Sequence, residues 1–386
     1  MKTVITAAQL LTPNEGIDHP VLLVEDGLIV NLGTREQLAV PDGARRHDFP
    51  DKILAPGLID IHIHGGSGHD VMEPGASARA AIEHGMVKHG VTSYLPTTVT
   101  APLPDTLRSL EHMGKAMQGH NEPGRSRPLG IHLEGPFISH AKRGVHPPEN
   151  LLRPSPELLR RFHEASGGNV RMLTIAPEID GAVETIAEAV KLGIHISMGH
   201  SNATLAEANL GIAAGARHAT HTFNAMRPLD HREPGILGAV LCDDRLTADL
   251  IADGLHVDPA VIRIFLRAKG KDGAILITDA ISATGMPDGR YKLGGFEVEV
   301  KGDRCDLDGK LAGSVLTLDR AVRNVMKFVP CHLVDALRLA TVNPARVIGI
   351  SDTHGTLAAG RIADIVVLTP AGEVVATMAA GKFCTN

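Results

Sequence analysis

The sequence predicts an α/β fold, a (β/α)8 TIM-like barrel with a small β-sandwich domain formed by both chain termini. Three observations favour this fold class. Short apolar runs alternate with helical patterns in the middle of the chain, both ends carry strand and turn signals, and polar residues end several apolar runs, where a barrel places its active site. We expect the barrel over residues 55–349 and the small β domain over residues 1–54 and 350–386.

The two chain ends have the composition of short strands joined by turns. Residues 21–24 and 28–30 are apolar, and a Glu-Asp-Gly turn signal separates them. Near the other end, residues 362–368 and 374–378 form two apolar runs around an Ala-Gly-Glu turn signal. Because neither end can form a core alone, we expect both to pair in one small sheet domain.

Eight apolar runs characterise the middle of the chain, and helical patterns such as 182–192 and 203–214 lie between them. Strand–helix alternation over about 300 residues implies a parallel sheet, and eight is the number of strands in a (β/α)8 barrel. The runs cover residues 58–63, 92–98, 129–133, 172–176, 194–198, 218–221, 246–252 and 274–278.

Composition restricts the class of protein. The 386 residues are 43% hydrophobic and 21% charged with a net charge of −6, and the absence of basic runs disfavours a nucleic-acid surface. The four cysteines form no CxxC pair, which disfavours a thiolate zinc site and a disulfide framework. The sequence shows neither a signal-peptide core nor an apolar stretch of about 20 residues. We therefore expect a cytoplasmic protein without a membrane span.

Two histidines, His62 and His64, end the first apolar run. Side chains at positions i and i+2 of a strand share one face, so both imidazoles would point into the mouth of the barrel and could hold one metal. The following Gly65 and Gly66 allow a sharp turn there. The alternative is a pair of unrelated histidines, one of them a core residue with satisfied hydrogen bonds.

Glu134, His200 and His221 end later runs. A carboxylate at the end of an apolar strand is costly to bury without a partner, which a metal would supply, although an exposed loop acid is the alternative. Each histidine alone would more often be structural. Together with His62 and His64, the set suits one or two divalent ions, with zinc as the first choice and iron, manganese or cobalt as alternatives.

Asp279 follows the last apolar run. Beside a metal-activated water it could act as general base and then as general acid, whereas a helix N-cap is the structural alternative. His146, Arg232 and His256 are further polar candidates. A cationic side chain near a metal site suggests an anionic substrate, although an arginine in such a loop is by default a solvated surface residue.

Eight short motifs extend over almost the whole chain. His-x-His and Thr-Asp-Ala are widespread motifs, whereas His-Leu-Glu-Gly-Pro-Phe and Arg-Glu-Pro-Gly are much more specific. The motifs lie at residues 56–65, 132–137, 198–201, 220–226, 232–235, 252–256, 278–280 and 311–314. With them the chain resembles the N-acetylglucosamine-6-phosphate deacetylase family of the amidohydrolase superfamily.

The resemblance implies a metal site and a catalytic acid/base. The residues that match metal ligands are Glu134, His200, His221, His62, His64 and Asp279. The first three match the principal ligands, and the next two histidines match a pair found in members that hold a second metal. Asp279 matches both a shared ligand and the catalytic acid/base.

The resemblance also implies substrate contacts. His146 matches the histidine that polarises the acetamide carbonyl, and Arg232 and His256 match phosphate contacts. In this family the arginine reaches the neighbouring site across a dimer interface, which implies a homodimer with Arg232 in that role. The loop positions that match substrate contacts are Asn224, Ala225, Leu311, Ala312 and Gly313.

The implied reaction is metal-dependent hydrolysis of the acetamide of N-acetylglucosamine 6-phosphate to glucosamine 6-phosphate and acetate, in amino-sugar catabolism. Many amidohydrolases bridge two metals with a carboxylated lysine on the fourth strand, but the run 172–176 has no lysine, so we expect Glu134 to bridge. This difference disfavours dihydroorotase-like and urease-like relatives. Three alternatives remain: the same chemistry on N-acetylgalactosamine 6-phosphate, another amidohydrolase reaction such as removal of acyl groups from amino acids, and a non-catalytic barrel acting as a binding module.

Overall fold

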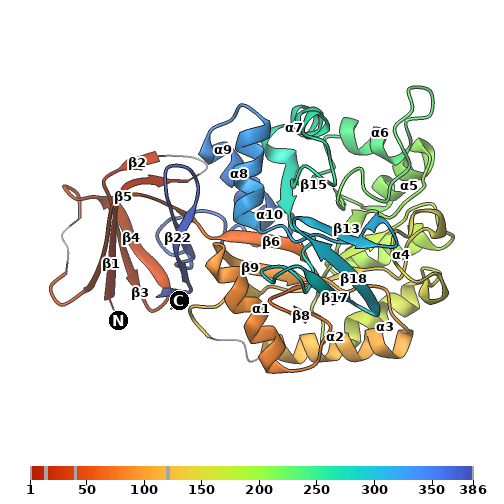
Figure 1. Cartoon of the computed structure of the whole chain (residues 1–386), viewed down its shortest axis with the longest axis horizontal. Helices are drawn as coiled ribbons and strands as arrows, with labels where there is room; N and C mark the ends of the chain where they lie inside the picture. Colours follow the sequence, from red (N-terminus) through yellow and green to blue (C-terminus); the bar gives the residue numbers. More distant parts are fainter. Residues whose placement is uncertain (1, 13–15, 39–40, 119–121, 385–386) are drawn as a thin grey trace.

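The protein consists of an α/β body and a sheet built from both chain ends, which lie side by side along the long axis (Figure 1). The structure, a computed structural model, describes residues 2–12, 16–38, 41–118 and 122–384. No helix in these ranges is long and apolar enough to cross a membrane.

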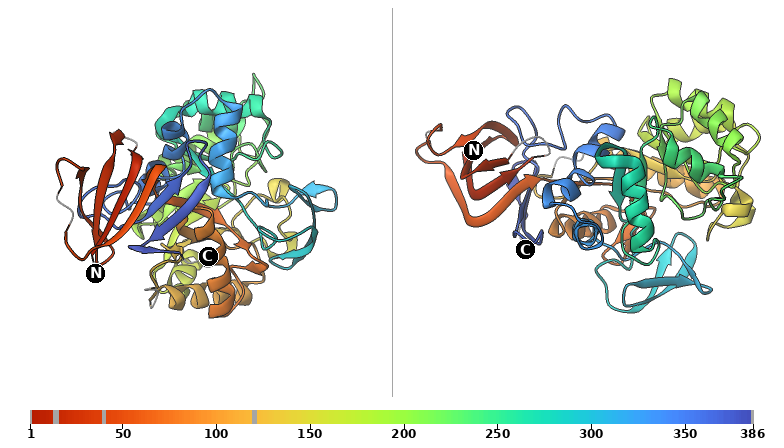
Figure 2. Two further views of the ribbon diagram at one scale, coloured as in Figure 1. Left: turned by 60° about the vertical axis from the view of Figure 1, so that its left-hand side comes forward. Right: turned by 90° about the horizontal axis from the view of Figure 1, so that it is seen from above.

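The two chain ends pair in one sheet, as the sequence predicts. β21 (Ile365–Leu368) pairs antiparallel with β5 (Arg45–Pro56), and β5 pairs parallel with β1 (Lys2–Leu11). The strand order over the described residues is β23-β22-β21-β5-β1-β3-β4, and β2 pairs antiparallel with the last residues of β1. In Figure 2 the red strands of the N-terminal end and the blue strands of the C-terminal end lie together. The other strands are β2 (Gly16–Asp18), β3 (Pro20–Glu25), β4 (Leu28–Thr34), β22 (Val374–Ala379) and β23 (Lys382–Phe383).

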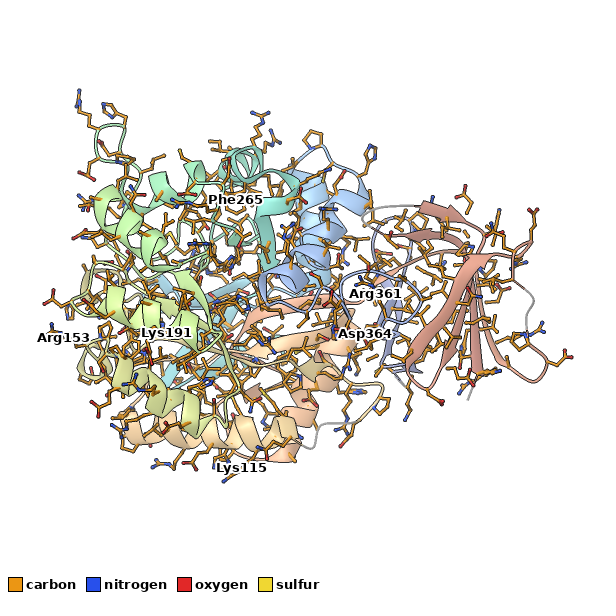
Figure 3. The ribbon with its side chains drawn as sticks, turned by 180° about the vertical axis from the view of Figure 1, so that it is seen from behind. Lys115, Arg153, Lys191, Phe265, Arg361 and Asp364 are labelled. Carbon is orange, nitrogen blue, oxygen red and sulfur yellow. The ribbon has the colours of Figure 1, made fainter. Side chains whose placement is uncertain are left out.

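This terminal sheet has its own apolar core. Ile5 in β1, Leu54 in β5 and Ile365 in β21 are fully buried in it. Burial of each such side chain contributes roughly 1.5–3 kcal/mol. An ion pair ties the sheet to the body, because the Arg127 guanidinium lies 2.7 Å from the carboxylate of Asp364, which sits at the junction of the two parts (Figure 3).

Eight strands form the parallel centre of the body as far as the structure describes it, and each overlaps one predicted apolar run. They are almost completely buried, which explains their near-continuous apolar composition. The strands are β6 (Leu58–Ile63), β9 (Val91–Pro96), β11 (Ile131–Glu134), β12 (Val170–Ile175), β13 (His195–Met198), β14 (His218–Ala219), β15 (Ala248–Ile251) and β16 (Ala274–Ile277).

These strands follow one another in chain order. β6 pairs with β9, β11 to β14 pair successively, and β15 pairs with β16, all in parallel. A bridge at Thr97 joins β9 to β11, and the Ala219 amide donates to the Thr247 carbonyl at 3.0 Å between β14 and β15. A bridge between Ile63 and Ala280 brings the end of β16 back to β6. The strand ends of the whole body therefore meet in one region.

Helices alternate with these strands and cover them (Figure 1). The predicted helix over 203–214 begins two residues later because Thr204 is its N-cap and forms a capping box with Glu207. The predicted helix over 182–192 is α4. The helices are α1 (Ala76–Lys88), α2 (Leu103–Gln118), α3 (Pro156–Ala165), α4 (Ala182–Lys191), α5 (Leu205–Ala214), α6 (Gly235–Cys242), α7 (Pro259–Gly273), α8 (Leu318–Phe328), α9 (Leu333–Arg338) and α10 (Val342–Val347).

A small antiparallel sheet, which follows β16 and precedes α8 in the chain, projects from the body and lies outside the predicted elements (Figure 2). Leu293 and Val298 from this sheet are buried with Ile281, which follows β16. The Gly294 amide donates to the Asp70 carboxylate at 2.8 Å and fixes the sheet against the body. Its strands are β17 (Gly289–Leu293), β18 (Phe296–Lys301), β19 (Arg304–Leu307) and β20 (Lys310–Leu311).

Candidate metal centre and substrate pocket

The predicted metal ligands meet at the carboxyl ends of the parallel strands. His62 lies near the end of β6, and Glu134 is the last residue of β11. His200, His221 and Asp279 each follow the last residue of a strand by two positions, after β13, β14 and β16. All of these side chains are buried, so their polar atoms need partners within the protein or a bound ion.

The backbone turns sharply at three of these residues. The φ angle is 48° at His200, 30° at His221 and 51° at Asp279, a region that costs a non-glycine residue roughly 1–3 kcal/mol. This turn ends β14 at Ala219, two residues before the predicted end of that run. Asp279 is followed by the bridged residue Ala280 instead of a helix, which removes the helix-cap alternative. Strain of this kind concentrates at functional sites.

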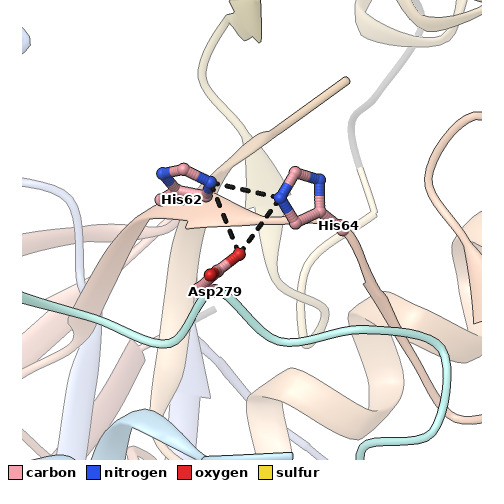
Figure 4. A group of neighbouring side chains, drawn as sticks. All are labelled: His62, His64 and Asp279. Carbon is pink, nitrogen blue, oxygen red and sulfur yellow. Dashed lines mark hydrogen bonds and ion pairs between the residues drawn. The ribbon is translucent and has the colours of Figure 1, made fainter. Parts of the chain in front are cut away.

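His62, His64 and Asp279 form a first cluster of candidate ligand atoms (Figure 4). The two Nε2 atoms lie 3.2 Å apart. The Asp279 Oδ1 atom lies 3.6 Å from Nε2 of His62 and 3.1 Å from Nε2 of His64. Three candidate metal-ligand atoms therefore lie close together. Two of them belong to His62 and His64, whose spacing on the strand predicts that they share one face.

Glu134, His200 and His221 form a second cluster. The Nε2 atoms of the two histidines are 3.0 Å apart, and Glu134 Oε1 lies 3.3 Å from His200 and 3.1 Å from His221. The Glu134 carboxylate also contacts the first cluster, with Oε2 3.2 Å from Nε2 of His64 and Oε1 3.4 Å from Nε2 of His62. It therefore lies between the two clusters.

Two of the four histidines in the clusters have their rings oriented for metal binding by a hydrogen bond of Nδ1. Nδ1 of His64 lies 3.0 Å from the Thr97 carbonyl oxygen, and Nδ1 of His200 lies 2.9 Å from the Lys142 carbonyl oxygen. A carbonyl oxygen only accepts, so each Nδ1 carries the proton and each Nε2 presents a lone pair to its cluster. Metal-binding histidines are held in this way, and the donor set of imidazole and carboxylate fits a divalent metal.

In the metal-free protein, the imidazoles and carboxylates of the two clusters stabilise one another's charged forms. Burial lowers the pKa of His64, but hydrogen bonds to Asp279 and Glu134 outweigh it and hold this pKa well above its usual range. Burial likewise lowers the pKa of His221, and the contact with Glu134 raises it to about 9. Burial raises the pKa of Asp279, whereas the hydrogen bond to His64 and the charge of His62 bring it down to about 2. Asp279 is therefore ionised at neutral pH.

A pocket of about 190 Å³ opens above these clusters. His146 lies in its wall, with Nε2 3.7 Å from Glu134 Oε2. Burial, assisted by the charge of His200, lowers the pKa of His146 to about 3, so this imidazole is neutral at neutral pH. The other predicted substrate residues that line the pocket are Asn224, Ala225, His256, Leu311, Ala312 and Gly313.

The sequence model described as "Amidohydrolase family" matches residues 53–384, which is most of the chain. The chain belongs to the amidohydrolase family. This finding and the similar proteins below confirm the resemblance that the motifs indicate.

Individual relatives of this amidohydrolase cover nearly its whole length. It is 37% identical to an N-acetylglucosamine-6-phosphate deacetylase of Bacillus subtilis, over 97% of this chain and 95% of the relative. It is 36% identical to an N-acetylgalactosamine-6-phosphate deacetylase of Escherichia coli O157:H7, over 95% of each chain. It superposes with a TM-score of 0.92 and 36% identity, over 100% of both chains, on a mutant N-acetyl-D-glucosamine-6-phosphate deacetylase of Mycobacterium smegmatis in complex with N-acetyl-D-glucosamine 6-phosphate.

Arg232 is the predicted substrate residue that the amidohydrolase chain does not bring to its own pocket. It is exposed in the loop before α6, and the residues that line the pocket do not include it. The Asp230 carboxylate accepts a hydrogen bond from the Arg232 amide at 2.8 Å and shapes this loop. His256, in contrast, lines the pocket and lies 2.6 Å from Asp253 through Nδ1.

Several residues of the site lie outside the sequence predictions. Leu293 and Val99 line the pocket, and Leu293 comes from the small sheet that no motif indicates. Thr97, Thr98 and Thr100 follow β9 and contact His64, Glu134 and His146, respectively, through backbone or hydroxyl groups. The available signal for this segment was the threonines at the end of the predicted run 92–98 and the threonine that follows it at position 100.

Proposed function

We propose that this amidohydrolase hydrolyses the acetamide of N-acetylglucosamine 6-phosphate to glucosamine 6-phosphate and acetate, in amino-sugar catabolism. It is an amide hydrolase that acts on a linear C–N bond. The observation that carries the proposal is the ionised, buried Asp279 beside two imidazole–carboxylate clusters at the floor of a small pocket. Relatives named as deacetylases of this substrate, at 37–41% identity over at least nine-tenths of the chain, support it.

Both clusters suit a divalent metal. Glu134, His200 and His221 would hold the principal ion, and His62, His64 and Asp279 a second ion, with Glu134 between them. Zinc is our proposed metal because four imidazoles and two carboxylates match its preferences. When bound, such a metal polarises the substrate carbonyl and makes water more acidic.

Asp279 and His146 would perform the proton transfers and the polarisation. As a carboxylate with a pKa of about 2, Asp279 accepts a proton from the attacking water and then delivers it to the leaving amine. The neutral His146 donates a hydrogen bond to the carbonyl oxygen, where negative charge develops as water attacks.

The substrate phosphate would be bound by His256 and by Arg232 of the neighbouring subunit in a homodimer. Two observations support this arrangement: Arg232 is exposed, and its own pocket lacks it. A planar guanidinium matches phosphate in two parallel hydrogen bonds. The sugar would contact Asn224, Ala225 and the loop at residues 311–313.

The same proposal includes the architecture that positions these residues. We infer that the eight parallel strands close into a (β/α)8 barrel over residues 55–349. The chain-order pairing of the strands and the bridge from Ile63 to Ala280 support this inference. Residues 1–54 and 350–386 would form the accompanying β-sandwich domain.

Acetate release by the purified protein tests the function, with bound metal quantified in the same sample. We expect Asp279→Asn to reduce kcat by roughly 10²–10⁴-fold while substrate binding is largely retained, because the acid/base is lost and the pocket is not. Near-normal turnover by this variant would contradict the mechanism. Much lower activity on the sugar without phosphate would support the phosphate contacts and argue against hydrolysis of acylated amino acids.

A second candidate substrate is N-acetylgalactosamine 6-phosphate, because the Escherichia coli O157:H7 relative is named for that sugar. The ratio of kcat/KM for the two sugar phosphates decides between the epimers. A non-catalytic binding module is disfavoured because all six candidate ligands are in place. Protein that contains no metal and hydrolyses neither sugar would restore that alternative.

A further inference from the structure

His146 has a hydrogen-bonding environment unlike that of the neighbouring histidines. Its Nδ1 atom accepts a hydrogen bond from the Thr100 backbone amide at 3.3 Å, and the Thr100 hydroxyl lies 2.8 Å from the same nitrogen. A backbone amide only donates, so this Nδ1 must present a lone pair. The ring proton of the neutral imidazole is then on Nε2.

Two of the candidate metal ligands, His64 and His200, show the opposite pattern. Carbonyl oxygens of Thr97 and Lys142 face Nδ1 of His64 and His200, respectively. Those rings carry the proton on Nδ1 and present a lone pair from Nε2. One site therefore holds two kinds of histidine, and for His64, His200 and His146 the group that faces Nδ1 determines which kind the ring is.

We propose that Thr100 is a positioning residue that fixes His146 in its Nε2–H form, so that this ring donates a hydrogen bond to the acetamide carbonyl instead of binding metal. This inference deepens the proposed function and rests on it. In the other tautomer, Nε2 would offer a lone pair to the carbonyl oxygen, and the contact would be repulsive instead of stabilising.

The surrounding fold keeps Thr100 in this role. Thr100 is 4% exposed in the segment after β9, so water does not compete for its hydroxyl. Gly135 follows the β11 residue Glu134 and has a φ angle of 71°, and a Cβ atom there would lie 2.1 Å from Thr100 Oγ1 and 3.6 Å from His146 Nδ1. Only a residue without a side chain leaves space for the contact between Thr100 and His146.

Thr100→Val tests the proposal, because valine keeps the shape and removes the hydroxyl donor. We expect kcat to fall about tenfold with KM changed less than about twofold, since one hydrogen bond that supports the transition state is weakened. Thr100→Ser should restore kcat. Thr185→Val is the matched control: it removes a buried hydroxyl that donates to the carbonyl of Gly181, the residue before α4, and it should leave kcat unchanged.

Nitrogen NMR of histidine-labelled, zinc-loaded protein provides a readout independent of turnover. The His146 signals, assigned by their loss in His146→Asn, should show Nδ1 without and Nε2 with a proton in the parent. In Thr100→Val the fraction of this form should be smaller, because only the longer amide contact of 3.3 Å still opposes a proton on Nδ1. A protonated Nδ1 in the parent would overturn the proposal, as would unchanged kcat and unchanged signals in folded Thr100→Val. If the parent hydrolyses neither sugar phosphate, the proposed function fails, while the NMR result still decides the tautomer.

Discussion

At the scale of single residues, the partner of one ring nitrogen determines what each histidine can do. Carbonyl oxygens keep a proton on Nδ1 of His64 and His200, so these rings present a lone pair to the clusters once Nε2 is deprotonated, whereas His146 faces an amide and presents a proton from Nε2. Glu134 connects the two clusters. Its Oε2 atom contacts His64 of the first cluster, and its Oε1 atom contacts both His62 of the first cluster and His221 of the second. The chemistry of the site thus depends on hydrogen bonds that no ligand motif contains.

Metal binding should release protons. In the metal-free protein, the pKa of His221 is about 9 and that of His64 is well above its usual range, so both rings are protonated at pH 7. A ring must lose its proton before Nε2 binds metal. We expect the apparent Zn²⁺ affinity to rise with pH up to at least about 9, by about tenfold per pH unit for each proton released.

Calorimetric titration of the metal-free protein at pH 7 in two buffers with different ionisation enthalpies measures this release. The heat should differ between the buffers in proportion to the protons released. His195→Gln, a change in β13 outside both clusters, is a control that should release the same number of protons. Identical heats in both buffers would contradict the expectation.

At the scale of elements, short strands and the loops that follow them place the ligands, while helices shield the strands. Where α1 packs on β9, a carboxyl group is buried, and burial disfavours its ionised form. Glu83 of α1 is fully buried, its carboxylate accepts a hydrogen bond from the Tyr94 hydroxyl at 3.3 Å, and Arg79 lies 3.4 Å away. Burial raises the pKa of Glu83 from 4.5 to about 7, although Arg79 partly opposes it.

Glu83→Gln should therefore change how stability depends on pH. Between about pH 4.5 and 7 the unfolded chain releases a proton that folded Glu83 retains, so this residue lowers stability progressively as pH rises through that window. Relative to the parent, the variant should gain up to about 3 kcal/mol of unfolding free energy between pH 5 and pH 8. Denaturation with urea at the two pH values measures the gain.

The matched control for this variant is Glu184→Gln on α4, where the side chain is exposed. Its stability should differ from that of the parent by less than about 0.5 kcal/mol at both pH values. A Glu83→Gln difference that is equal at pH 5 and pH 8 would show that Glu83 does not titrate in the window.

At the scale of the whole molecule, the exposed loop with Arg232 predicts that each site depends on a second subunit. Mixed dimers test this directly. Asp279→Asn and Arg232→Ala should each be nearly inactive alone, because one lacks the acid/base and the other lacks the phosphate contact. In a mixed dimer, the subunit that keeps Asp279 receives Arg232 from its partner and forms one intact site.

Equal amounts of the two variants, dissociated and reassociated at random, should therefore recover about a quarter of the parental activity, since half of the dimers are mixed and each has one intact site of two. Each variant reassociated with itself is the control. No recovery, with mixed dimers demonstrated by differently tagged subunits, would place Arg232 at its own site or outside catalysis.

Much of this organisation could be predicted from residues alone. The eight apolar runs became eight strands because burial on both faces requires continuous apolar sequence. The ligands could be predicted at strand ends because the motifs place His62, Glu134 and Asp279 directly where those runs stop. The sheet at 289–311 was not predicted, although a strand such as Phe296–Lys301 alternates apolar and charged residues as a strand with one buried face does.

The sequence by itself determined the strand pattern, the type and order of the candidate ligands, and the family. Only the tertiary structure decided which groups face each ring nitrogen, that Glu134 lies between two clusters, and that Arg232 is outside its own pocket. Periodicity and motifs concern residues that are close together in the sequence, whereas the contact between Lys142 and His200 joins loops 58 residues apart. Thr100 shows the same dependence, because it reaches His146 only after β9 and β11 place their following loops together.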